Sequence, residues 1–513
     1  MRVKIILGWI ALFIVVLSSC ERPLNPVAEG ILTFDRDSVN FDSVFTTLLT
    51  PSERLIVHNE QNKDLVISRV WLERGDASEF DMIVDGIQGG EATDVVIARK
   101  DSMHIFVNLK SKEQDAWVED YILFEIGDEI QRVLVRARVV DAYFLKARIK
   151  LENQFLNLDS GSFFFRRDTV LTPEKPIIMD GPIFIPEGVT VTVLPGTEIF
   201  FTPYKFTVRD SSNVPTVGLY SWLIVDGTLK AEGTVDLPIE FKSVRFDSAA
   251  LENPAQWRGL RFLPSSKDNI LRHCTVKNAQ IGIEVDSIPV NDQPKLTVQY
   301  CQIRNMGVHG VVGVGVDGSG SVAAALPSIL MENTVVNTCK QHTVLTIGGG
   351  KYDFFNCTFA NFNLAWPRFS RRSPQIRLSN WFTFDGITAD IYPSYTRFVN
   401  CAIWGSEEDE IVLDTLNGAP FDLLVFDHSL VRVSQDYFPA VSPHLKDAIA
   451  NVDPLFNDFT LWDYRPLETS PLINAGVDNP QGSSGYLDDI RGRMDSLRYD
   501  GFDIGAWEYW PLE

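Results

Sequence analysis

A short pattern that recurs through the second half of the chain constrains its fold more than any other feature. Each copy has a second residue that is usually Cys and a branched or aromatic fourth residue, and most copies end in Asn. The second positions are separated by 24 to 44 residues, the length of one or two coils of a parallel β-solenoid. The copies are His273–Asn278, Tyr300–Asn305, Glu332–Asn337, Asn356–Asn361, Asn400–Gly405 and the degenerate Asp427–Arg432.

Stacking of these coils predicts an inward column of small side chains. Neighbouring strands of a sheet lie about 4.8 Å apart, so equivalent positions of successive coils become neighbours. We expect positions 274, 301, 333, 357, 401 and 428 to form this column, with Cys acting as a small apolar side chain. A redox pair is the alternative, because a bridge between Cys274 and Cys301 would be within disulfide reach. The terminal Asn is expected at a bend, where its amide satisfies backbone groups.

The C-terminal region carries a second set of motifs. They occur in the order Val452–Phe456, Asp463–Leu467, Ser470–Gly476, Asp489–Gly492 and Asp503–Glu508. Together with the Asn-Cys repeats they resemble the terminal segment of bacterial β-helix surface proteins, including the family called choice-of-anchor Q. The resemblance covers residues 182–513 and implies a right-handed parallel β-helix of the pectate-lyase-like type. It implies no activity, because such β-helices host lyases, hydrolases, adhesins and structural proteins.

The region from residue 31 to residue 140 has a different texture. Short alternating strands are separated by polar turns, without a helical period, which is typical of a β-sandwich. The step Val57–Asn59 followed by the strand Leu65–Val70 resembles the immunoglobulin-like domains of major sperm protein and of hydin-type spacers. That resemblance implies a spacer or a docking surface.

The first twenty residues predict the location of the protein. Arg2 and Lys4 precede an apolar run over residues 5–17, which is too short to span a bilayer comfortably but suits a signal peptide. Cys20 follows two small residues and resembles the lipidated cysteine of bacterial lipoproteins. The alternative is a cleaved soluble signal with an incidental Cys. We expect an outer-membrane lipid anchor in the bacterial cell envelope, with the protein facing the periplasm or the cell surface.

The sequence therefore predicts an all-β protein of five segments. They are a lipoprotein signal peptide at 1–19, a lipid-anchored tether at 20–30, an immunoglobulin-like β-sandwich at 31–145, a right-handed single-stranded parallel β-helix at 146–451, and a C-terminal capping segment at 452–513. The capping segment is expected to cover the unpaired strand edges at the end of the solenoid.

Charge and motif content exclude several function classes. The chain has 46 basic and 68 acidic residues, a net charge of -22, which disfavours a nucleic-acid partner. The Gly313–Gly318 run matches a dinucleotide-binding pattern but lies inside a solenoid repeat, so we interpret it as a loop and expect no cofactor. Glu407–Glu410 is either a solvated loop or a calcium site, and we expect no other metal.

An insertion between residues 362 and 395 is the predicted ligand contact. It concentrates aromatic and basic residues in an acidic chain, and such side chains stack on sugar rings and bind carboxylates or sulfates. The alternative is a packing loop whose arginines offset nearby acids. The candidate ligand-binding residues are Trp366, Arg368, Arg371, Arg372, Arg377 and Trp381.

These observations favour a non-enzymatic envelope lipoprotein that binds glycan, or another envelope protein, along the solenoid flank. The alternative is a polysaccharide lyase or glycoside hydrolase that acts on a surface or extracellular polysaccharide. Hydrolases of this fold need carboxylates on one sheet face. The predicted outward positions are Lys277, Arg304, Val336 and Ala360, which form no carboxylate row, so we assign no catalytic residue.

Overall fold

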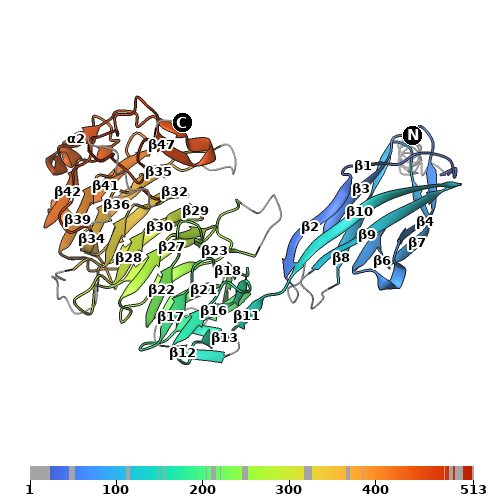
Figure 1. The fold of residues 1–513 in the computed structure, drawn as a ribbon, viewed down its shortest axis with the longest axis horizontal. Helices are drawn as coiled ribbons and strands as arrows, with labels where there is room; N and C mark the ends of the chain where they lie inside the picture. Colours follow the sequence, from blue (N-terminus) through green and yellow to red (C-terminus); the bar gives the residue numbers. More distant parts are fainter. Residues whose placement is uncertain are drawn as a thin grey trace, which may run out of the picture. The chain divides into compact units, whose positions relative to one another are not determined.

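The structure is a computed structural model in which the chain is all-β and divides into two compact units, residues 1–141 and 142–513 (Figure 1). It describes residues 24–45, 52–110, 116–147, 149–153, 156–203, 205–209, 215–219, 221–244, 252–316, 326–364, 370–384, 386–478, 480–484, 489–491 and 501–510. The predicted signal peptide, Cys20, Trp366 and Arg368 lie outside these residues. Within them, no helix has the length and apolar character that crossing a bilayer requires.

The N-terminal unit consists of two sheets that share one hydrophobic core. Inward residues such as Val57, Ile67 and Phe124 alternate with polar or half-buried neighbours, as strands with one solvated face require. The first sheet contains β1 (Thr33–Phe34), β3 (Glu53–Asn59), β8 (Asp101–Leu109), β5 (Phe80–Val84) and β6 (Ile87–Gly89). The second contains β2 (Ser38–Phe45), β10 (Glu129–Val140), β9 (Ala116–Ile126), β4 (Leu65–Leu72) and β7 (Glu91–Ile97).

The second unit confirms the predicted parallel β-helix. Its chain passes repeatedly through three long sheets, here named S1, S2 and S3 (Figure 1). S1 contains β11 (Tyr143–Lys146), β15 (Ile177–Asp180), β18 (Glu198–Phe201), β23 (Ile239–Ser243), β26 (Cys274–Lys277), β29 (Gln302–Met306), β32 (Val335–Cys339), β35 (Thr358–Asn361), β40 (Ala402–Gly405), β43 (Leu430–Val431) and β45 (Ile449–Ala450). All neighbours in S1 pair in parallel.

The other two sheets complete each coil. S2 contains β13 (Leu156–Phe164), β16 (Pro182–Ile185), β21 (Trp222–Val225), β24 (Gly259–Phe262), β27 (Ile281–Asp286), β30 (His309–Val314), β33 (Val344–Ile347), β36 (Ile376–Ser379) and β41 (Ile411–Asp414), and β12 (Ile149–Asn153), β19 (Lys205–Arg209) and β20 (Pro215–Leu219) extend it with antiparallel pairs. S3 contains β14 (Thr169–Leu171), β17 (Thr190–Val193), β22 (Thr228–Glu232), β25 (Asn269–Arg272), β28 (Leu296–Gln299), β31 (Ile329–Glu332), β34 (Gly350–Phe355), β39 (Ser394–Val399), β42 (Leu423–Asp427) and β44 (Leu445–Lys446).

The predicted cysteine column exists, with a correction at two coils. Strand registers place Cys274, Cys301, Cys357 and Cys401 in one inward row of S1, and all four are free and buried. The intervening coil contributes Thr334, not Asn333, and the next coil after Cys401 contributes Ser429, not His428. The sequence comparison shifted these two copies by one residue because it aligned polar identities instead of inward-facing positions.

Asn333 and His428 instead lie at the bend between S3 and S1. The corner residue of each coil has a positive φ, from 43° to 55°, in the left-handed region that Asn tolerates better than most side chains. Two of them form a side-chain ladder, since the Asn400 amide donates to Asn356 Oδ1 at 2.9 Å. The corner residues are His273, Tyr300, Asn333, Asn356, Asn400 and His428.

The bend after S1 confirms part of the prediction for the terminal Asn. Asn278 and Asn305 have φ values of 63° and 61°, and Asn305 Nδ2 donates to Asn278 Oδ1 at 2.7 Å. In the shifted copy Thr338 takes this place, so Asn337 is the outward residue of β32. Val336, predicted to be outward, is fully buried in the solenoid interior.

The C-terminal segment covers a flank of the solenoid. Its apolar residues pack on outward residues of S1, including Val335, Ala360, Ala402 and Trp404. The contributing residues of the segment are Phe456 in β46 (Phe456–Asp458), Tyr464 in β47 (Asp463–Pro466), Leu472, Ile490, Ile504 and Ala506. The last coil itself is closed by the short helix α2 (Phe438–Val441), whose Val441 is buried in the solenoid core. The segment therefore caps the outer face of S1, a place that strand-edge reasoning did not predict.

Candidate functional site

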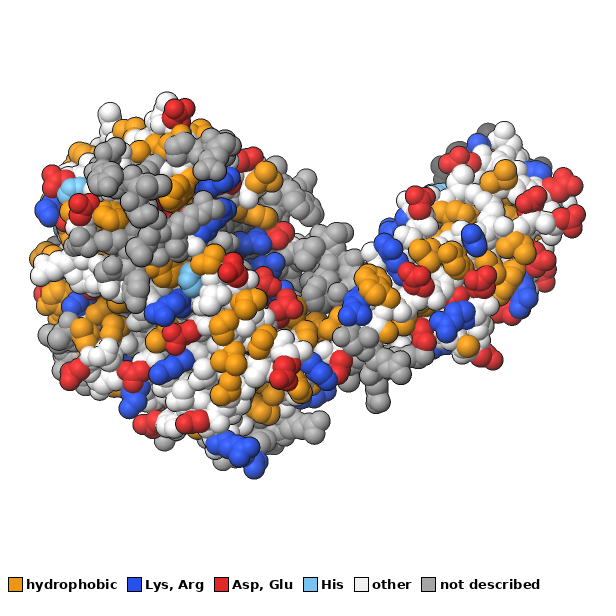
Figure 2. All heavy atoms as spheres, in the orientation of Figure 1, with side chains coloured by type: hydrophobic (Ala, Val, Ile, Leu, Met, Phe, Trp, Pro, Cys, Tyr) orange, Lys and Arg blue, Asp and Glu red, His pale blue; other side chains and the backbone are white. Residues whose placement is uncertain are grey.

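The outer face of S1 divides into two parts. Over β32 to β43 the C-terminal segment covers it. Over β18, β23, β26 and β29 its outward residues are mostly charged or polar, and we name this part the open face. The strand registers give two rows along it, one of Glu198, Glu240, Thr275 and Gln302 and one of Phe200, Lys242, Lys277 and Arg304. On the side of the second unit seen in Figure 2, acidic, basic and hydrophobic side chains are interspersed.

A pocket of about 210 Å³ lies where the C-terminal segment meets the open face. The volume is below the roughly 300–1,000 Å³ of typical small-molecule sites, so the pocket suits one ring of a longer ligand. Thr275 and Gln302 belong to the open face and contribute side chains two residues before Lys277 and Arg304 on the same strands. The lining residues are Thr234, Val235, Pro238, His273, Cys274, Thr275, Tyr300, Gln302, Ile490, Arg491 and Trp507.

Two stacked pairs border this pocket. The rings of His273 and Tyr300 lie 4.8 Å apart at an angle of 13°, because both residues occupy the same corner of successive coils. On the C-terminal segment, the guanidinium of Arg491 lies 4.9 Å from the centre of the Trp507 ring. The indole Nε1 of Trp507 is buried and has no hydrogen-bond partner among the described residues. The pocket thus combines aromatic rings with an exposed guanidinium.

The two basic residues beside the pocket differ in whether they form an ion pair. Arg304 forms an ion pair with Glu252 at 2.8 Å and lies 4.5 Å from the centre of the Trp462 ring. Lys277 makes no ion pair with a described residue. Burial lowers the pKa of Lys277 and the neighbouring Arg304 adds to this effect, while Glu252 and Glu240 oppose it. Lys277 is therefore a half-buried amine close to a fixed guanidinium.

One carboxylate pair lies farther along the open face. Glu198 and Glu240 are in register on adjacent strands. Lys242 bridges them, with an Nζ–Oε1 distance of 2.6 Å to Glu198 and a contact to Glu240. Burial opposes the charge on Glu240, but the hydrogen bond and the charge of Lys242, together with the charge of Lys277, outweigh burial and lower the pKa of that carboxyl. A lowered pKa is the opposite of what a carboxylic acid needs to protonate a leaving group.

Among the insertion residues that the structure describes, Arg377 and Trp381 meet at Asp414, whereas Arg371 pairs with Glu410. Arg371 is fully buried, where its guanidinium pairs with Glu410 and donates to the Asn361 carbonyl at 2.9 Å. Arg377 in β36 pairs with Asp414 at an Nη2–Oδ2 distance of 2.6 Å. The indole Nε1 of Trp381, in β37 (Trp381–Phe382), donates to Asp414 Oδ1 at 3.0 Å. Arg372 is exposed. All the contacts of Arg371 are made inside the fold. The described part of the insertion therefore resembles the alternative that we considered, a packing loop whose arginines offset nearby acids.

Glu407–Glu410, the possible calcium site, is partly used inside the fold. Burial raises the pKa of Glu410 to about 7, although its contact with Arg371 opposes the shift. Its oxygens also accept hydrogen bonds from the backbone of Glu407 and Gln375, at 2.9 Å and 3.2 Å. Asp409 Oδ1 accepts from the Ser434 backbone at 2.7 Å. Calcium binding here stays a prediction that would require rearrangement of Glu410.

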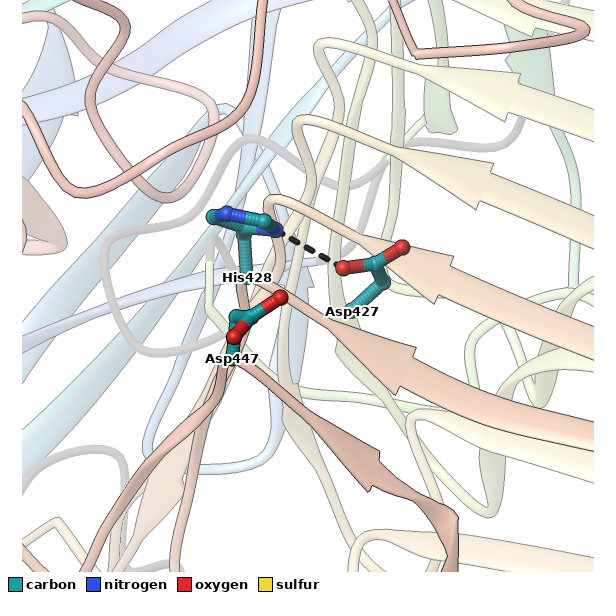
Figure 3. A group of neighbouring side chains, drawn as sticks. All are labelled: Asp427, His428 and Asp447. Carbon is teal, nitrogen blue, oxygen red and sulfur yellow. Dashed lines mark hydrogen bonds and ion pairs between the residues drawn. The ribbon is translucent and has the colours of Figure 1, made fainter.

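A second group of possible metal ligands lies at the last S3–S1 corner. Ligand atoms of Asp427, His428 and Asp447 lie within 4.8 Å of one another, and Figure 3 shows the His428 ring pointing to Asp427. His428 Nδ1 is 2.7 Å from Asp427 Oδ1, while Lys446 Nζ is 2.7 Å from Asp427 Oδ2. A divalent cation would compete with this ammonium group, so we assign no metal to the corner.

The aspartates of the C-terminal segment accept hydrogen bonds within that segment. Asp503 accepts backbone hydrogen bonds from Asn474 and Tyr509, at 2.8 Å and 2.6 Å, and Asp489 accepts one from Arg491 at 2.8 Å. Asp489 thereby holds the backbone next to the Arg491–Trp507 pair that borders the pocket.

Two larger open depressions, of about 410 Å³ and 350 Å³, lie in the N-terminal unit around Asp101 and Ser102. Neither is lined by Trp, Tyr or Arg. We therefore take the S1 pocket as the candidate site. In comparisons with known proteins, no protein-family model and no curated protein matches the chain.

The sequence offered an incomplete signal for this site. The repeat pattern correctly predicts that Lys277 and Arg304 are outward neighbours. From these residues we concluded only that the sheet face has no row of carboxylates, and we did not predict a binding site there. Arg491 and Trp507 lie about two hundred residues downstream, and nothing in their local sequence indicates that they meet the coils of Cys274 and Cys301.

Proposed function

We propose that the protein is a lipid-anchored protein of the bacterial envelope that binds a polysaccharide chain along the open face of its β-helix, without cleaving it. One observation carries this proposal: a ring-sized pocket bordered by two aromatic pairs continues into a surface with Lys277 and Arg304. Aromatic faces stack on sugar rings, and guanidinium groups bind carboxylates with two parallel hydrogen bonds. A chain with carboxylate groups, such as a polyuronate, suits this combination best.

The remaining parts of the chain support a capture role. A lipidated Cys20 would hold the protein at the membrane, and the tether at 20–30 contains two prolines. The sandwich of residues 31–141, with its own hydrophobic core, would serve as an immunoglobulin-like spacer. An elongated solenoid face then offers several coils to an elongated ligand.

Affinity electrophoresis of the full chain tests the proposal. Gels would contain polygalacturonate or, as a neutral comparison, hydroxyethylcellulose. We expect the double variant Arg491→Ala/Lys277→Gln to bind polygalacturonate about thirtyfold more weakly, because two charge contacts of roughly 1 kcal/mol each are lost. Lys267→Gln/Lys340→Gln is the matched control, since it removes two exposed cations elsewhere on the same unit. Unchanged retention of the double variant would refute the proposed site.

A second candidate function, β-elimination of a polyuronate, is favoured by the state of Lys277. Burial lowers the pKa of this amine and so enlarges its neutral fraction. Nζ could accept the proton on the carbon next to the uronate carboxylate, while Arg304 neutralises that carboxylate. The carbon–carbon double bond would form as the glycosidic carbon–oxygen bond breaks, with its electron pair leaving on the departing sugar oxygen.

Product analysis separates the two functions. Elimination creates a conjugated double bond, so ultraviolet absorbance would rise when the full chain is mixed with polygalacturonate. Lys277→Gln would abolish this rise, while Lys277→Arg would not restore it because a guanidinium stays protonated. Saturable retention without any rise in absorbance would leave binding as the function. Hydrolysis is less well supported, because Lys242 engages both Glu198 and Glu240.

A further inference from the structure

The N-terminal unit carries an aromatic and arginine-rich sheet face that the proposed function does not use. It is the outer face of β4, β9 and β10, where alternate residues point away from the core. On β9, Trp117, Tyr121 and Leu123 alternate with the inward Ile122 and Phe124. Strand pairing places Trp117 opposite Arg138, Tyr121 opposite Leu134 and Leu123 opposite both Arg132 and Trp71. On the side of this unit seen in Figure 2, hydrophobic side chains lie beside both basic and acidic ones.

The guanidinium groups on this face are positioned by the rings. Arg132 lies 4.9 Å from the centre of the Tyr121 ring, and Arg69 lies 4.6 Å from that of Trp71. Arg69 also pairs with Glu91 at 2.7 Å. Arg132 and Arg136, in contrast, form no ion pair with any residue that the structure describes, and Arg136 Nε has no partner there. The Tyr121 ring thus positions Arg132, and both Arg132 and Arg136 keep donors for a ligand.

Trp117 provides an open ring beside these cations. Its side chain is 60% exposed, which is unusual for the largest apolar residue. No cation lies over its ring among the described residues, whereas both Trp71 and Tyr121 are covered. Arg136 lies between Trp117 and Tyr121 along the sheet, opposite Glu119. The arrangement is one uncovered stacking platform next to two donor groups that can each bind a carboxylate or sulfate.

We infer that this face, formed by Trp117, Tyr121, Arg132 and Arg136, is a second binding surface for an anionic glycan. One sugar ring stacks on Trp117, and the carboxylate or sulfate groups of successive sugars in the same chain bind Arg136 and Arg132. Charge complementarity favours an anionic ligand over a neutral one, because basic residues outnumber acidic ones among the outward side chains of β4, β9 and β10. They are Arg69, Arg132, Arg136 and Arg138 against Glu119 and Glu125. The inference does not rest on the solenoid site. If both are correct, one long chain can engage two sites and gain avidity.

The test uses the full chain with the solenoid site already weakened by Arg491→Ala/Lys277→Gln. In this background we compare Trp117→Ala and Arg132→Gln/Arg136→Gln with Arg54→Gln, an exposed arginine on the other sheet. Affinity gels would contain polygalacturonate, dextran sulfate or neutral hydroxyethylcellulose. We expect both face variants to lose about tenfold in affinity for at least one anionic gel, and Arg54→Gln to lose none.

Each outcome decides the question. Loss of retention confined to the face variants, with unchanged melting temperatures, supports the inference. An equal loss of retention with Arg54→Gln would mean that only the net charge of the protein matters, and it would overturn the inference. Retention that is unaffected in every anionic gel also overturns it and would point to a protein partner for the face. If the double variant binds as tightly as the unmodified chain while the face variants in that background do not bind, the solenoid proposal fails and this inference stands.

Discussion

The two parts of the S1 outer face differ although they continue the same rows. In the open part, the outward row reads Lys242, Lys277 and Arg304, whereas the covered part continues with Asn337, Ala360 and Trp404. The inward row keeps small residues through both parts, from Cys274 to Ser429. The interior therefore specifies coil stacking uniformly, while the outward row specifies where the C-terminal segment lies and where solvent or a ligand has access.

The transition between the two parts coincides with the candidate site. Trp462 of the C-terminal segment stacks on Arg304, the last basic residue of the row. One row over, Gln302 lines the pocket and its register neighbour Val335 is covered. The C-terminal segment covers only part of the S1 outer face, so its edge rises above the uncovered part. The pocket lies at this edge.

A charge introduced into the covered part should have the largest effect on stability. Ala360→Glu would bury a carboxylate among Trp404, Tyr464 and other apolar residues without a cation partner. We expect a loss of more than about 3 kcal/mol in the free energy of unfolding, measured by urea denaturation. Gln302→Glu, which is exposed in the open part, should cost less than about 0.5 kcal/mol. Equal losses would contradict the division of the face.

Asn400 provides the next largest effect, since it attaches the C-terminal segment to a coil corner. Its amide donates to Asn356 Oδ1 and the Val477 carbonyl, both at 2.9 Å, and its Oδ1 accepts from the Val477 backbone at 2.8 Å. Its φ is 54°, which Asn tolerates better than Ala. Asn400→Ala should cost roughly 2–4 kcal/mol by thermal or urea unfolding.

The control for this variant separates hydrogen bonding from backbone conformation. Asn400→Asp keeps a residue that tolerates a left-handed backbone and keeps the acceptor for Val477, but it loses both donated bonds. We expect it to cost less than Asn400→Ala. A larger loss for Asp would indicate that charge burial, and not the backbone, dominates at this corner.

The sequence predicted the interior better than the exterior, for a physical reason. Inward positions such as Cys301 and Ile303 meet copies of themselves, so their pattern repeats and can be recognised. Outward positions contact the segment that covers them, which does not repeat from coil to coil. The role of Ala360 or Trp404 can therefore be predicted only when the covering segment is known. The one-residue shift at Asn333 arose where a hydroxyl, that of Thr334, replaced Cys in the column.

The predicted insertion site illustrates the same limit. Arg371 was an attractive ligand contact in an acidic chain, yet its partner Glu410 lies 39 residues away, at the start of the next coil. Whether an arginine faces solvent or a buried carboxylate depends on how coils of unequal length stack. Local sequence does not contain that information when loops vary in length, as they do between Phe362 and Ile411.

The outward row of S3 also has a covered and an uncovered end, and we expect substitutions there to change stability less than those in S1. Glu232, Arg272, Gln299 and Glu332 are in register, but of these four only Gln299 and Glu332 are buried, and both contact Ser484 of the C-terminal segment. The Glu332 oxygens accept from the Ser484 backbone at 2.6 Å and from the Ser484 hydroxyl at 2.5 Å. Glu332→Gln should cost about 1.5–3 kcal/mol and speed proteolysis of the C-terminal segment, because hydrogen bonds to a charged group are weakened.

Glu232→Gln is the matched variant at the uncovered end of this row. It loses an ion pair to Arg272 of 3.1 Å, and the Glu232 side chain is 43% exposed. We expect a change of no more than about 0.5 kcal/mol and an unchanged proteolysis rate. Faster proteolysis of this variant would mean that the two ends of the row are not energetically distinct.

The smallest effect is expected from the bridge on the open face, and it should depend on pH. Burial raises the pKa of Glu240, but the hydrogen bond and the charge of Lys242, together with the charge of Lys277, outweigh burial, so the pKa is lowered in the folded protein. A lowered acid pKa contributes stability above the ordinary pKa of 4.5, and this contribution is lost as pH falls through the folded value. Lys242→Met should therefore cost up to about 1 kcal/mol at pH 7 and less at pH 3. Urea denaturation of both proteins at the two pH values measures the difference, and a gap that persists at pH 3 would attribute the cost to the contact of Lys242 with the Phe200 ring instead.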